Sequence, residues 1–265
     1  MTPRGRRLLF LASAAILGLV LYLGLAGLPN FGHETAEYGQ VLNAVSVSQR
    51  HIPDVVTAVN FDYRSIDTMG EEFIFFAAVG GVLLLLGAQD DEEPGHVDDA
   101  AADRWVPPTS DAVRVLGLAL VGPTVLFALY VVAHGHLSPG GGFQGGVVLA
   151  TAVLLVYLAG EYQHLHGLYP DAVIEGVEFG GAVSYVVLGI VGVAVSGSFL
   201  ANWAPLGRIG ALNSAGIVPL INVAVGAEVA AGFVLLLSAF LRQTLVLRRR
   251  PPAPRAMSNP PRTRP

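Results

Sequence analysis

Six long runs of apolar residues dominate this sequence and restrict the folds that it can adopt. A transmembrane helix needs about 20 consecutive, mostly apolar residues. The six runs that approach or exceed this length lie at 8–28, 72–88, 112–133, 141–160, 176–197 and 216–241. Only 13% of the residues are charged, whereas soluble domains carry about 25%, so water cannot surround most of the chain. The sequence therefore predicts an all-α integral membrane bundle of about six transmembrane helices.

The arginines predict the orientation of this bundle, because cytoplasmic loops are enriched in basic residues. Arg4, Arg6 and Arg7 precede the first run, and four more arginines follow the sixth: Arg242, Arg248, Arg249 and Arg250. Six spans place both ends on the same side, which agrees with two basic ends. The first run exceeds the usual apolar core of a signal peptide, about 7–15 residues, which favours an uncleaved anchor. We expect a multi-pass protein of the cell membrane with both termini in the cytoplasm.

Composition also suggests how the chain is divided. The segment 89–110 is acidic and ends in prolines, which is typical of a solvated cytoplasmic linker. No EF-hand spacing accompanies its acids, which disfavours a calcium site. The linker separates a two-helix module at 1–88 from a four-helix domain at 111–245, and a basic, proline-rich tail at 246–265 is expected to be disordered.

A glycine-rich stretch, GHLSPGGGFQGG at 135–146, leads into the fourth run. A phosphate-binding loop of the Walker type needs a lysine, and every basic residue of this chain is arginine. His134 and His136 do not share a face of a helix, and His164 and His166 are expected on the other side of the bilayer, so no metal site is predicted. We therefore interpret the stretch as a helix-start motif, a tight return into the membrane with Pro139 in the first helical turn. Its residues are His136, Pro139, Gly140, Gly141, Gly142, Gly145 and Gly146.

Two interpretations of this motif stay open. Its glycines allow the backbone of a neighbouring helix to approach closely, which is a packing role. Alternatively, exposed N–H groups at the helix start line an ion path.

A second group of polar residues, NFDYRSIDTMGEE at 60–72, precedes the second run. Thr68 and Glu71 have the spacing of a capping box, and Arg64 can pair with Asp62 or Asp67. Asp62, Arg64, Asp67, Glu71 and Glu72 crowd this helix entrance, and the helix dipole suits the glutamates in its first turn. A structural role therefore accounts for every charge in this group. The functional alternative is an ion funnel at the outer face, to which we assign Asp62, Arg64, Asp67 and Glu71.

Glu228 lies near the middle of the sixth run. A carboxylate at that depth costs at least a few kcal/mol, so it must face protein or water, and desolvation favours its neutral form. The small residues Ala224, Ala231 and Gly232 share its face and suit close helix packing. Either Glu228 takes part in proton or Na⁺ transfer, or it is a protonated, hydrogen-bonded packing residue. Glu175 and Glu178 open the fifth run, where the helix dipole accounts for them.

The chain contains no motif of covalent catalysis. It has no cysteine, no G-x-S-x-G nucleophile elbow and no dinucleotide-binding fingerprint. We therefore expect neither an enzyme nor a cofactor.

The two glycine-rich stretches, GHLSPGGGFQGG at 135–146 and PLGRIGALNSAGIVPLINVAVGAEVAAG at 205–232, resemble the B subunit of the multisubunit Na⁺/H⁺ antiporters of the Mrp (Mnh) type. This resemblance covers roughly 110–245. The segment VNFDYRSIDTMGE is similar to one at the C-terminal end of the large A subunit of these antiporters, or in the E subunit of membrane-bound hydrogenases. It keeps Asp62, Arg64, Asp67, Thr68, Gly70 and Glu71, and departs at Tyr63, Ser65, Ile66 and Met69.

The resemblance implies a fusion of that hairpin with a B subunit, within a complex related to the membrane arm of respiratory complex I. The pumping subunits of such complexes carry lysine on broken helices, which this chain lacks, so an accessory subunit of a cation/proton antiporter is expected. Other hydrophobic subunits, lipid, Na⁺ and H⁺ would be its partners, and nucleic acid would not. The predicted ion path uses Asp62, Arg64, Asp67 and Glu71 at the outer face and Glu228 within the membrane. A subunit of a redox-driven hydrogenase-like complex and a scaffold without ion contact are the alternatives.

Overall fold

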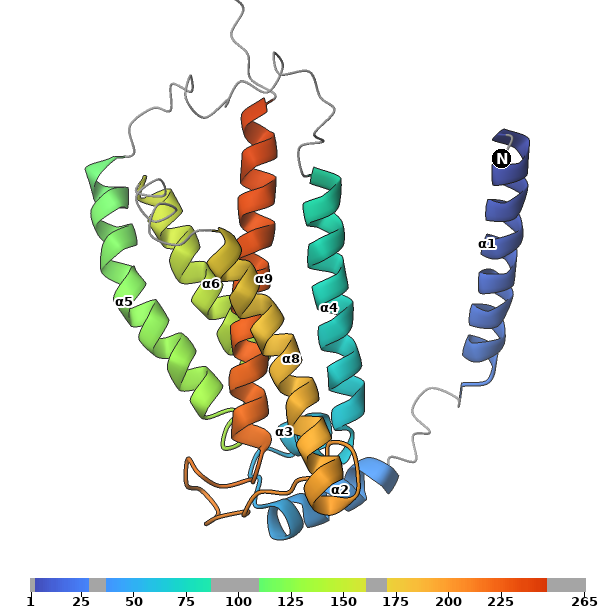
Figure 1. The fold of residues 1–265 in the computed structure, drawn as a ribbon, viewed down its shortest axis with the longest axis vertical. Helices are drawn as coiled ribbons and strands as arrows, with labels where there is room; N and C mark the ends of the chain where they lie inside the picture. Colours follow the sequence, from blue (N-terminus) through green and yellow to red (C-terminus); the bar gives the residue numbers. More distant parts are fainter. Residues whose placement is uncertain (1–2, 29–36, 87–109, 161–170, 247–265) are drawn as a thin grey trace, which may run out of the picture. The chain divides into compact units, whose positions relative to one another are not determined.

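The computed structural model describes residues 3–28, 37–86, 110–160 and 171–246, and these residues form helices joined by loops (Figure 1). The elements are α1 (Pro3–Ala26), α2 (Glu37–Arg50), α3 (Val55–Ala58), the π-helix η1 (Val59–Tyr63), α4 (Ser65–Leu86), α5 (Asp111–Ala133), α6 (Gly142–Leu158), α8 (Asp171–Ser196) and α9 (Val218–Val246). No strand occurs in these ranges. The all-α prediction is confirmed.

Six helices carry the apolar runs of the sequence. Four are long and apolar enough to cross a membrane: Ser65–Leu86, Asp111–Ala133, Ala172–Ser196 and Val218–Phe240. Shorter apolar stretches lie at Phe10–Ala26, which is part of α1, and at Gly142–Leu158, which is α6. Their outer surfaces are apolar: Leu84 and Leu85 of α4 are each 84% exposed, and Leu126 of α5 is 71% exposed. The chain is a multi-pass membrane protein, since such surfaces need lipid or another apolar chain around them.

The chain separates into two compact units, Met1–Leu42 and Asn43–Pro265. The first contains α1, whose described apolar side chains, such as Leu8, Phe10 and Tyr22, are exposed. The second contains α4 to α9. The linker 89–110, apart from Ser110, and the tail from 247 onward lie outside the described residues, as do His164 and His166. The division into modules that we predict stays a prediction.

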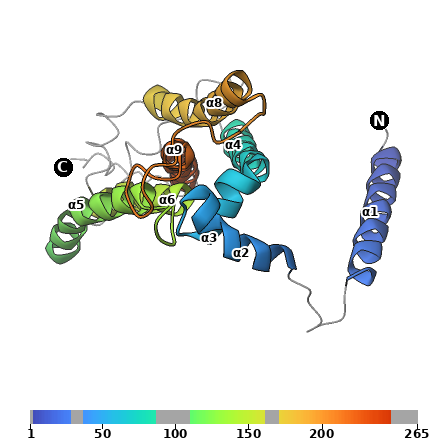
Figure 2. The same cartoon turned by 90° about the horizontal axis from the view of Figure 1, so that it is seen from below.

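Helix α9 is the centre of the second unit. Of its membrane-spanning residues 56% are buried, against 11% for α4 and for α5. It packs against α8, α6, α4 and α5, and the view along the bundle shows α9 between α8, α4 and α6 (Figure 2). Any residue that points from α9 toward its neighbours is therefore removed from both water and lipid.

Glycines bring the helices close to α9. A Cβ added to Gly142 of α6 would lie 2.5 Å from the carbonyl oxygen of Asn222, and one added to Gly146 would lie 2.8 Å from Cβ of Val229. On the opposite side, a Cβ on Gly181 of α8 would lie 2.7 Å from Cβ of Glu228. Such separations are too short for any larger residue, so α6 and α8 meet α9 backbone to backbone.

The start of the second run differs from our expectation. Helix α4 begins at Ser65, not at 72, and π-helix η1 and helices α2 and α3 occupy much of the segment 29–71 that hydropathy leaves as a loop. Helix α2 is short and polar, so a search for long apolar runs cannot detect it. The predicted capping box is wrong, because Thr68 lies inside α4 and its hydroxyl donates instead to the carbonyl oxygen of Asn60, at 2.7 Å.

Candidate functional site

Glu228 occupies the most buried position that a charged residue holds in the described part of the chain. Its exposure is 0%, and neither carboxyl oxygen has a hydrogen-bond partner among the described residues. Gly181 of α8 packs against its Cβ and its backbone nitrogen. One of our two interpretations takes Glu228 as a hydrogen-bonded packing residue, and the described residues do not supply the hydrogen bond that it requires. A buried acid without a partner is expensive and is retained where function requires it.

Two further glutamates lie close to Glu228. Glu72 of α4 and Glu178 of α8 are 4% and 6% exposed, and one carboxyl oxygen of each is also buried without a hydrogen-bond partner among the described residues. Their charges act on Glu228. Gly232 of α9 leaves room for the side chain of Glu178, since Oε1 of Glu178 lies 3.2 Å from where a Cβ of Gly232 would stand. Three helices thus bring one carboxyl group each to the same interior region, which we call the three-glutamate cluster (Glu72, Glu178 and Glu228).

The contact between Ser65 and Tyr185 sets the relative height of α4 and α8. Tyr185 is 1% exposed, its hydroxyl donates to the Ser65 carbonyl oxygen at 3.0 Å, and the two hydroxyl oxygens are also 3.0 Å apart. Glu72 stands seven residues after Ser65, and Glu178 seven residues before Tyr185. In α4 the chain leads away from this contact, and in α8 it leads toward it. Because seven helical residues span about 10 Å, both glutamates lie about 10 Å from the contact, in the same direction along the bundle.

Sequence reasoning missed Glu72 and Glu178 as site residues. It assigned both to helix starts, where a dipole explanation suffices. A detectable signal was the spacing of small and polar residues along one face of α4, where Ser65, Thr68, Glu72 and Val79 are the buried residues. Positions separated by three, four and seven residues share a face of a helix, so Glu72 belongs to the buried face and Glu71 does not.

The predicted outer funnel divides into two parts. Arg64 pairs with Asp67, and the side chains of both are about half exposed; Glu71 is exposed as well. The side chain of Asp62 is 3% exposed and points elsewhere, toward Arg50 and Asn202. The structure therefore does not bring Asp62 together with Asp67 and Glu71.

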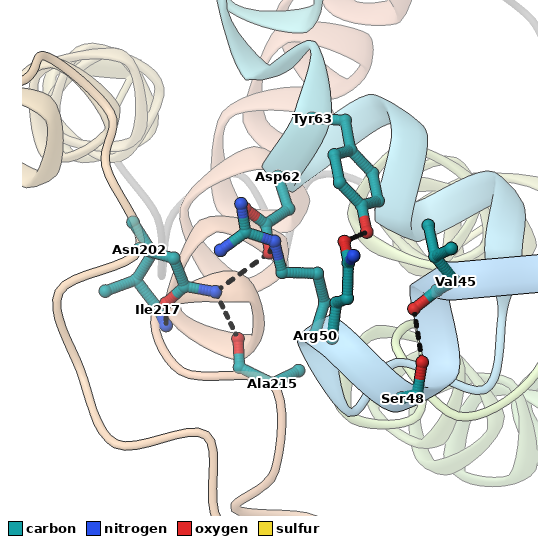
Figure 3. A network of polar contacts seen from close by, with 9 residues as sticks. Val45, Ser48, Arg50, Asp62, Tyr63, Asn202, Ala215 and Ile217 are labelled. Carbon is teal, nitrogen blue, oxygen red and sulfur yellow. Dashed lines mark hydrogen bonds and ion pairs between the residues drawn. The ribbon is translucent and has the colours of Figure 1, made fainter. Parts of the chain in front are cut away.

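Asp62 belongs to a polar network that closes one end of the bundle (Figure 3). Its Oδ2 lies 3.5 Å from Nε of Arg50 and accepts a hydrogen bond of 3.1 Å from Nδ2 of Asn202. The same Asn202 donates to the carbonyl oxygen of Ala215 at 3.1 Å and accepts from the backbone N–H of Ile217 at 2.9 Å. Burial raises the pKa of Asp62, while Asn202 and the charge of Arg50 act in the opposite direction.

The helix-start motif is held by hydrogen bonds to three other segments of the chain. The backbone N–H of Gly142 donates to Oδ1 of Asn222, at 2.8 Å, in α9. His136 is fully buried and its Nε2 lies 3.2 Å from the carbonyl oxygen of Ala211. The hydroxyl of Thr57 donates to the carbonyl oxygen of Gly135 at 2.6 Å. These contacts are those of a packed structural joint, and the first N–H of α6 faces Asn222.

Two details of this motif differ from our expectation or add to it. Pro139 does not stand in the first helical turn, because α6 begins only at Gly142. Gly140 and Gly141 take φ values of +141° and +117°, which side chains with a Cβ rarely adopt, and so carry the chain into the helix. Burial lowers the pKa of His136, and the contact with the Ala211 carbonyl opposes this shift only in part. Gly145 packs on α5, where its Cβ would meet Val132 and Ala128.

No three His, Cys, Asp or Glu side chains within the described ranges lie close enough together to hold a metal ion. The three-glutamate cluster is therefore not arranged as a ready-made metal site.

Comparison with known proteins places these features in context. Residues 112–235 match a family described as a domain related to the MnhB subunit of the Na⁺/H⁺ antiporter. An uncharacterised protein of Methanocaldococcus jannaschii is 31% identical over 207 residues, which is 72% of this chain and 78% of that protein. The B subunit of the Na⁺/H⁺ antiporter of Alkalihalophilus pseudofirmus is 31% identical over 77 residues, 29% of this chain and 53% of that protein.

Two solved structures share the arrangement of helices. One chain of the membrane-bound sulfane sulfur reductase, an archaeal respiratory membrane complex, is 29% identical with a TM-score of 0.65, over 89% of this chain and 98% of that chain. One chain of the Mrp complex from Dietzia sp. DQ12-45-1b is 24% identical with a TM-score of 0.63, over 96% of this chain and 27% of the other. Both neighbours are parts of multisubunit membrane complexes.

Proposed function

Because this chain belongs to the family of proteins related to the MnhB subunit of Na⁺/H⁺ antiporters, we propose that it is a membrane subunit of a multisubunit Na⁺/H⁺ antiporter and contributes to its ion pathway. One observation carries the proposal. Glu228, inside the segment that matches the family, is fully buried on the central helix and has no hydrogen-bond partner among the described residues. An acid that is removed from bulk water and has no partner among the described residues suits a group that exchanges a proton.

The exposed acids at the start of α4 support an approach route for cations. Asp67 and Glu71 are both exposed, and Arg64 pairs with Asp67. Negative charge at the mouth of a pathway raises the local concentration of cations. In this proposal Asp67 and Glu71 attract the ion at the outer face, Arg64 limits the local charge, and Asp62 holds the closed end of the bundle together. The termini lie in the cytoplasm, and the complex lies in the cell membrane.

The test is transport by the complete complex in everted membrane vesicles. Addition of Na⁺ dissipates a preformed proton gradient, which a pH-sensitive dye reports. We expect Glu228→Gln to abolish this response while the complex still assembles, because glutamine keeps the shape and cannot titrate. Glu175→Gln is the matched control, since Glu175 is an exposed carboxylate on α8, and it should transport normally. An unchanged Na⁺ response in Glu228→Gln would refute a role of Glu228 in the pathway.

A second function is favoured by one specific observation. The resemblance to one chain of the sulfane sulfur reductase complex covers 98% of that chain and 89% of this one. The alternative is therefore a subunit that couples ion movement to a redox reaction carried out by partner subunits. Purification of the native complex in mild detergent separates the two. Partners that contain iron–sulfur clusters, visible in the absorption spectrum, would favour the redox-driven complex, and colourless hydrophobic partners would favour the antiporter.

A further inference from the structure

We infer that Glu72, Glu178 and Glu228 form a single proton-binding site, in which the three carboxyl groups together carry fewer than three negative charges. The inference deepens the proposed function and rests on it for its role in transport. It adds two residues, Glu72 and Glu178, that neither helix-dipole reasoning nor the helix-start motif identifies. The ligand of the site is a proton, taken up and released as the complex moves cations.

The first argument is the unsatisfied chemistry of the three side chains. Four carboxyl oxygens of the cluster are buried without a hydrogen-bond partner among the described residues: one each from Glu72 and Glu178, and both from Glu228. A buried acceptor without a donor costs about 1–3 kcal/mol. Carboxyl groups that retain a proton supply the missing donors themselves, directly or through a trapped water. Structural packing alone would be served better by alanine or leucine at these positions.

The second argument is convergence from three separate helices. Gly181 lets Glu228 approach α8, and Gly232 makes room for Oε1 of Glu178, so α8 and α9 offer their carboxyl groups to each other across a glycine contact. Phe75, one turn after Glu72, packs against the same Gly232. Glu72 is therefore held at this level by the aromatic ring that follows it on α4.

The third argument is the surroundings of the cluster. The charged groups that act on Glu228 are Glu72 and Glu178. Neither an arginine nor a histidine that could neutralise the cluster is among them. On α4, exposed Glu71 adjoins Glu72; on α8, Glu175 acts on Glu178, and Tyr185 is bonded to Ser65. Helix α5 carries Asp111, Arg114 and Tyr130, and α6 carries Tyr157, all near helix ends, while η1 carries Asp62. Three like charges in an apolar interior without a counter-charge cannot all be ionised together.

The transfer step conserves charge and needs no further reactant. A neutral carboxyl group releases its O–H proton to a neighbouring carboxylate, directly or through water, and becomes the carboxylate while its neighbour becomes neutral. The total charge changes only when a proton enters or leaves the cluster. Exposed Glu71, next to Glu72 on α4, is the group where entry and exit would occur.

The experiment measures coupling between the three groups independently of transport. The intact complex in lipid nanodiscs is treated with dicyclohexylcarbodiimide, an apolar reagent that modifies protonated carboxyl groups, over a pH series. Mass spectrometry of peptides then gives the pH midpoint of labelling for each glutamate. We expect Glu72→Gln to move the labelling midpoint of Glu228 to lower pH by about one unit or more, since a neighbouring negative charge has been removed. Glu228→Gln should move the midpoint of Glu72 by a similar amount, because coupling is reciprocal.

Controls keep the test decisive. Glu175→Gln alters an exposed carboxylate on the same helix as Glu178 and should leave the midpoint of Glu228 unchanged. If Glu228→Gln fails to assemble, Glu72→Gln and Glu178→Gln still report on Glu228 itself. Independent midpoints in all variants would overturn the shared site. A complex that shows coupled labelling but no exchange of Na⁺ for H⁺ would refute the antiport function and leave the shared site standing.

Discussion

A Cβ placed on Gly181 would lie 2.7 Å from Cβ of Glu228 and 2.8 Å from its backbone nitrogen. This contact joins α8 to α9 at the height of the three-glutamate cluster, so the absence of a side chain at Gly181 controls how closely the acids approach one another.

The first prediction follows from that contact. Gly181→Ala forces α8 and α9 apart and should destabilise the protein by about 1–3 kcal/mol, seen as a lower midpoint of thermal unfolding of the complex. Gly180→Ala is the neighbouring control, because nothing lies within 4 Å of its added Cβ; it should be neutral or slightly stabilising, since alanine favours the helix. Equal effects of the two substitutions would contradict the close contact.

The second prediction concerns Asn222. Its Oδ1 accepts the N–H of Gly142 and its Nδ2 donates to the carbonyl oxygen of Val218, at 3.1 Å. Asn222→Ala leaves the first N–H of α6 buried without an acceptor and should cost about 1–3 kcal/mol. The control is Asn213→Ala in the exposed part of the preceding loop, which we expect to be silent. Thermal unfolding and the yield of assembled complex measure both.

The third prediction is a pH effect at Asp62. Burial holds its folded-state pKa above the usual 3.8, so the folded state binds the proton more tightly and stability falls as the pH rises through that pKa. The positive charge of Arg50 stabilises ionised Asp62 and so opposes this loss of stability. Because the side chain of Arg50 is 37% exposed, solvent weakens that effect. Arg50→Ala should therefore cost about 1 kcal/mol near neutral pH, and the deficit should shrink in acid as Asp62 becomes neutral.

The control for Arg50 is Arg64→Ala, which breaks the exposed pair with Asp67 and should change stability by less than about 0.5 kcal/mol. Unfolding midpoints of both variants over a pH series decide the matter. A deficit of Arg50→Ala that stays constant down to acidic pH would contradict the role of Asp62.

The fourth prediction has the opposite sign. Burial lowers the folded-state pKa of His136, so the unfolded chain binds a proton more readily and stability falls as the pH drops below about 6.5. His136→Gln keeps a donor for the Ala211 carbonyl and removes the titration. The wild-type complex should lose up to about 1.4 kcal/mol per pH unit from this residue, and the variant should lose less. An acid dependence that persists in His136→Gln would show that other groups cause it.

Much of the helical architecture is predictable because lipid imposes a length on apolar segments. The fourth run, expected at 141–160, is α6 at Gly142–Leu158, and the third, expected at 112–133, is α5 at Asp111–Ala133. The resemblance to the antiporter B subunit, carried by the glycine-rich stretches at 135–146 and 205–232, is confirmed. Those glycines lie in loops and helix contacts that tolerate few other residues.

The parts that escaped prediction depend on contacts between residues distant in sequence. Asp62 meets Asn202 across 140 positions, and no local pattern announces such a bond. From the sequence, Glu72 and Glu178 are interpreted as helix-start acids because hydropathy is averaged over all faces of a helix. Their burial depends on which face turns toward α9, and such an average does not contain that information. Helix α2 is too short and too polar to be detected as a membrane span. Thr68 has the spacing of a capping residue, but its hydroxyl donates to the carbonyl oxygen of Asn60, which lies upstream in η1.

The glycine contacts around α9 also restrict how this subunit can move. Gly142 and Gly146 of α6 and Gly181 of α8 leave no free space beside its backbone, and Phe75 of α4 fills the gap at Gly232. A rotation or a one-turn slide of α9 would drive side chains into these backbones. In the proposed pathway, conformational signals from partner subunits would therefore reach Glu228 through rotamer changes inside a stiff frame, and not through a piston-like stroke of the central helix.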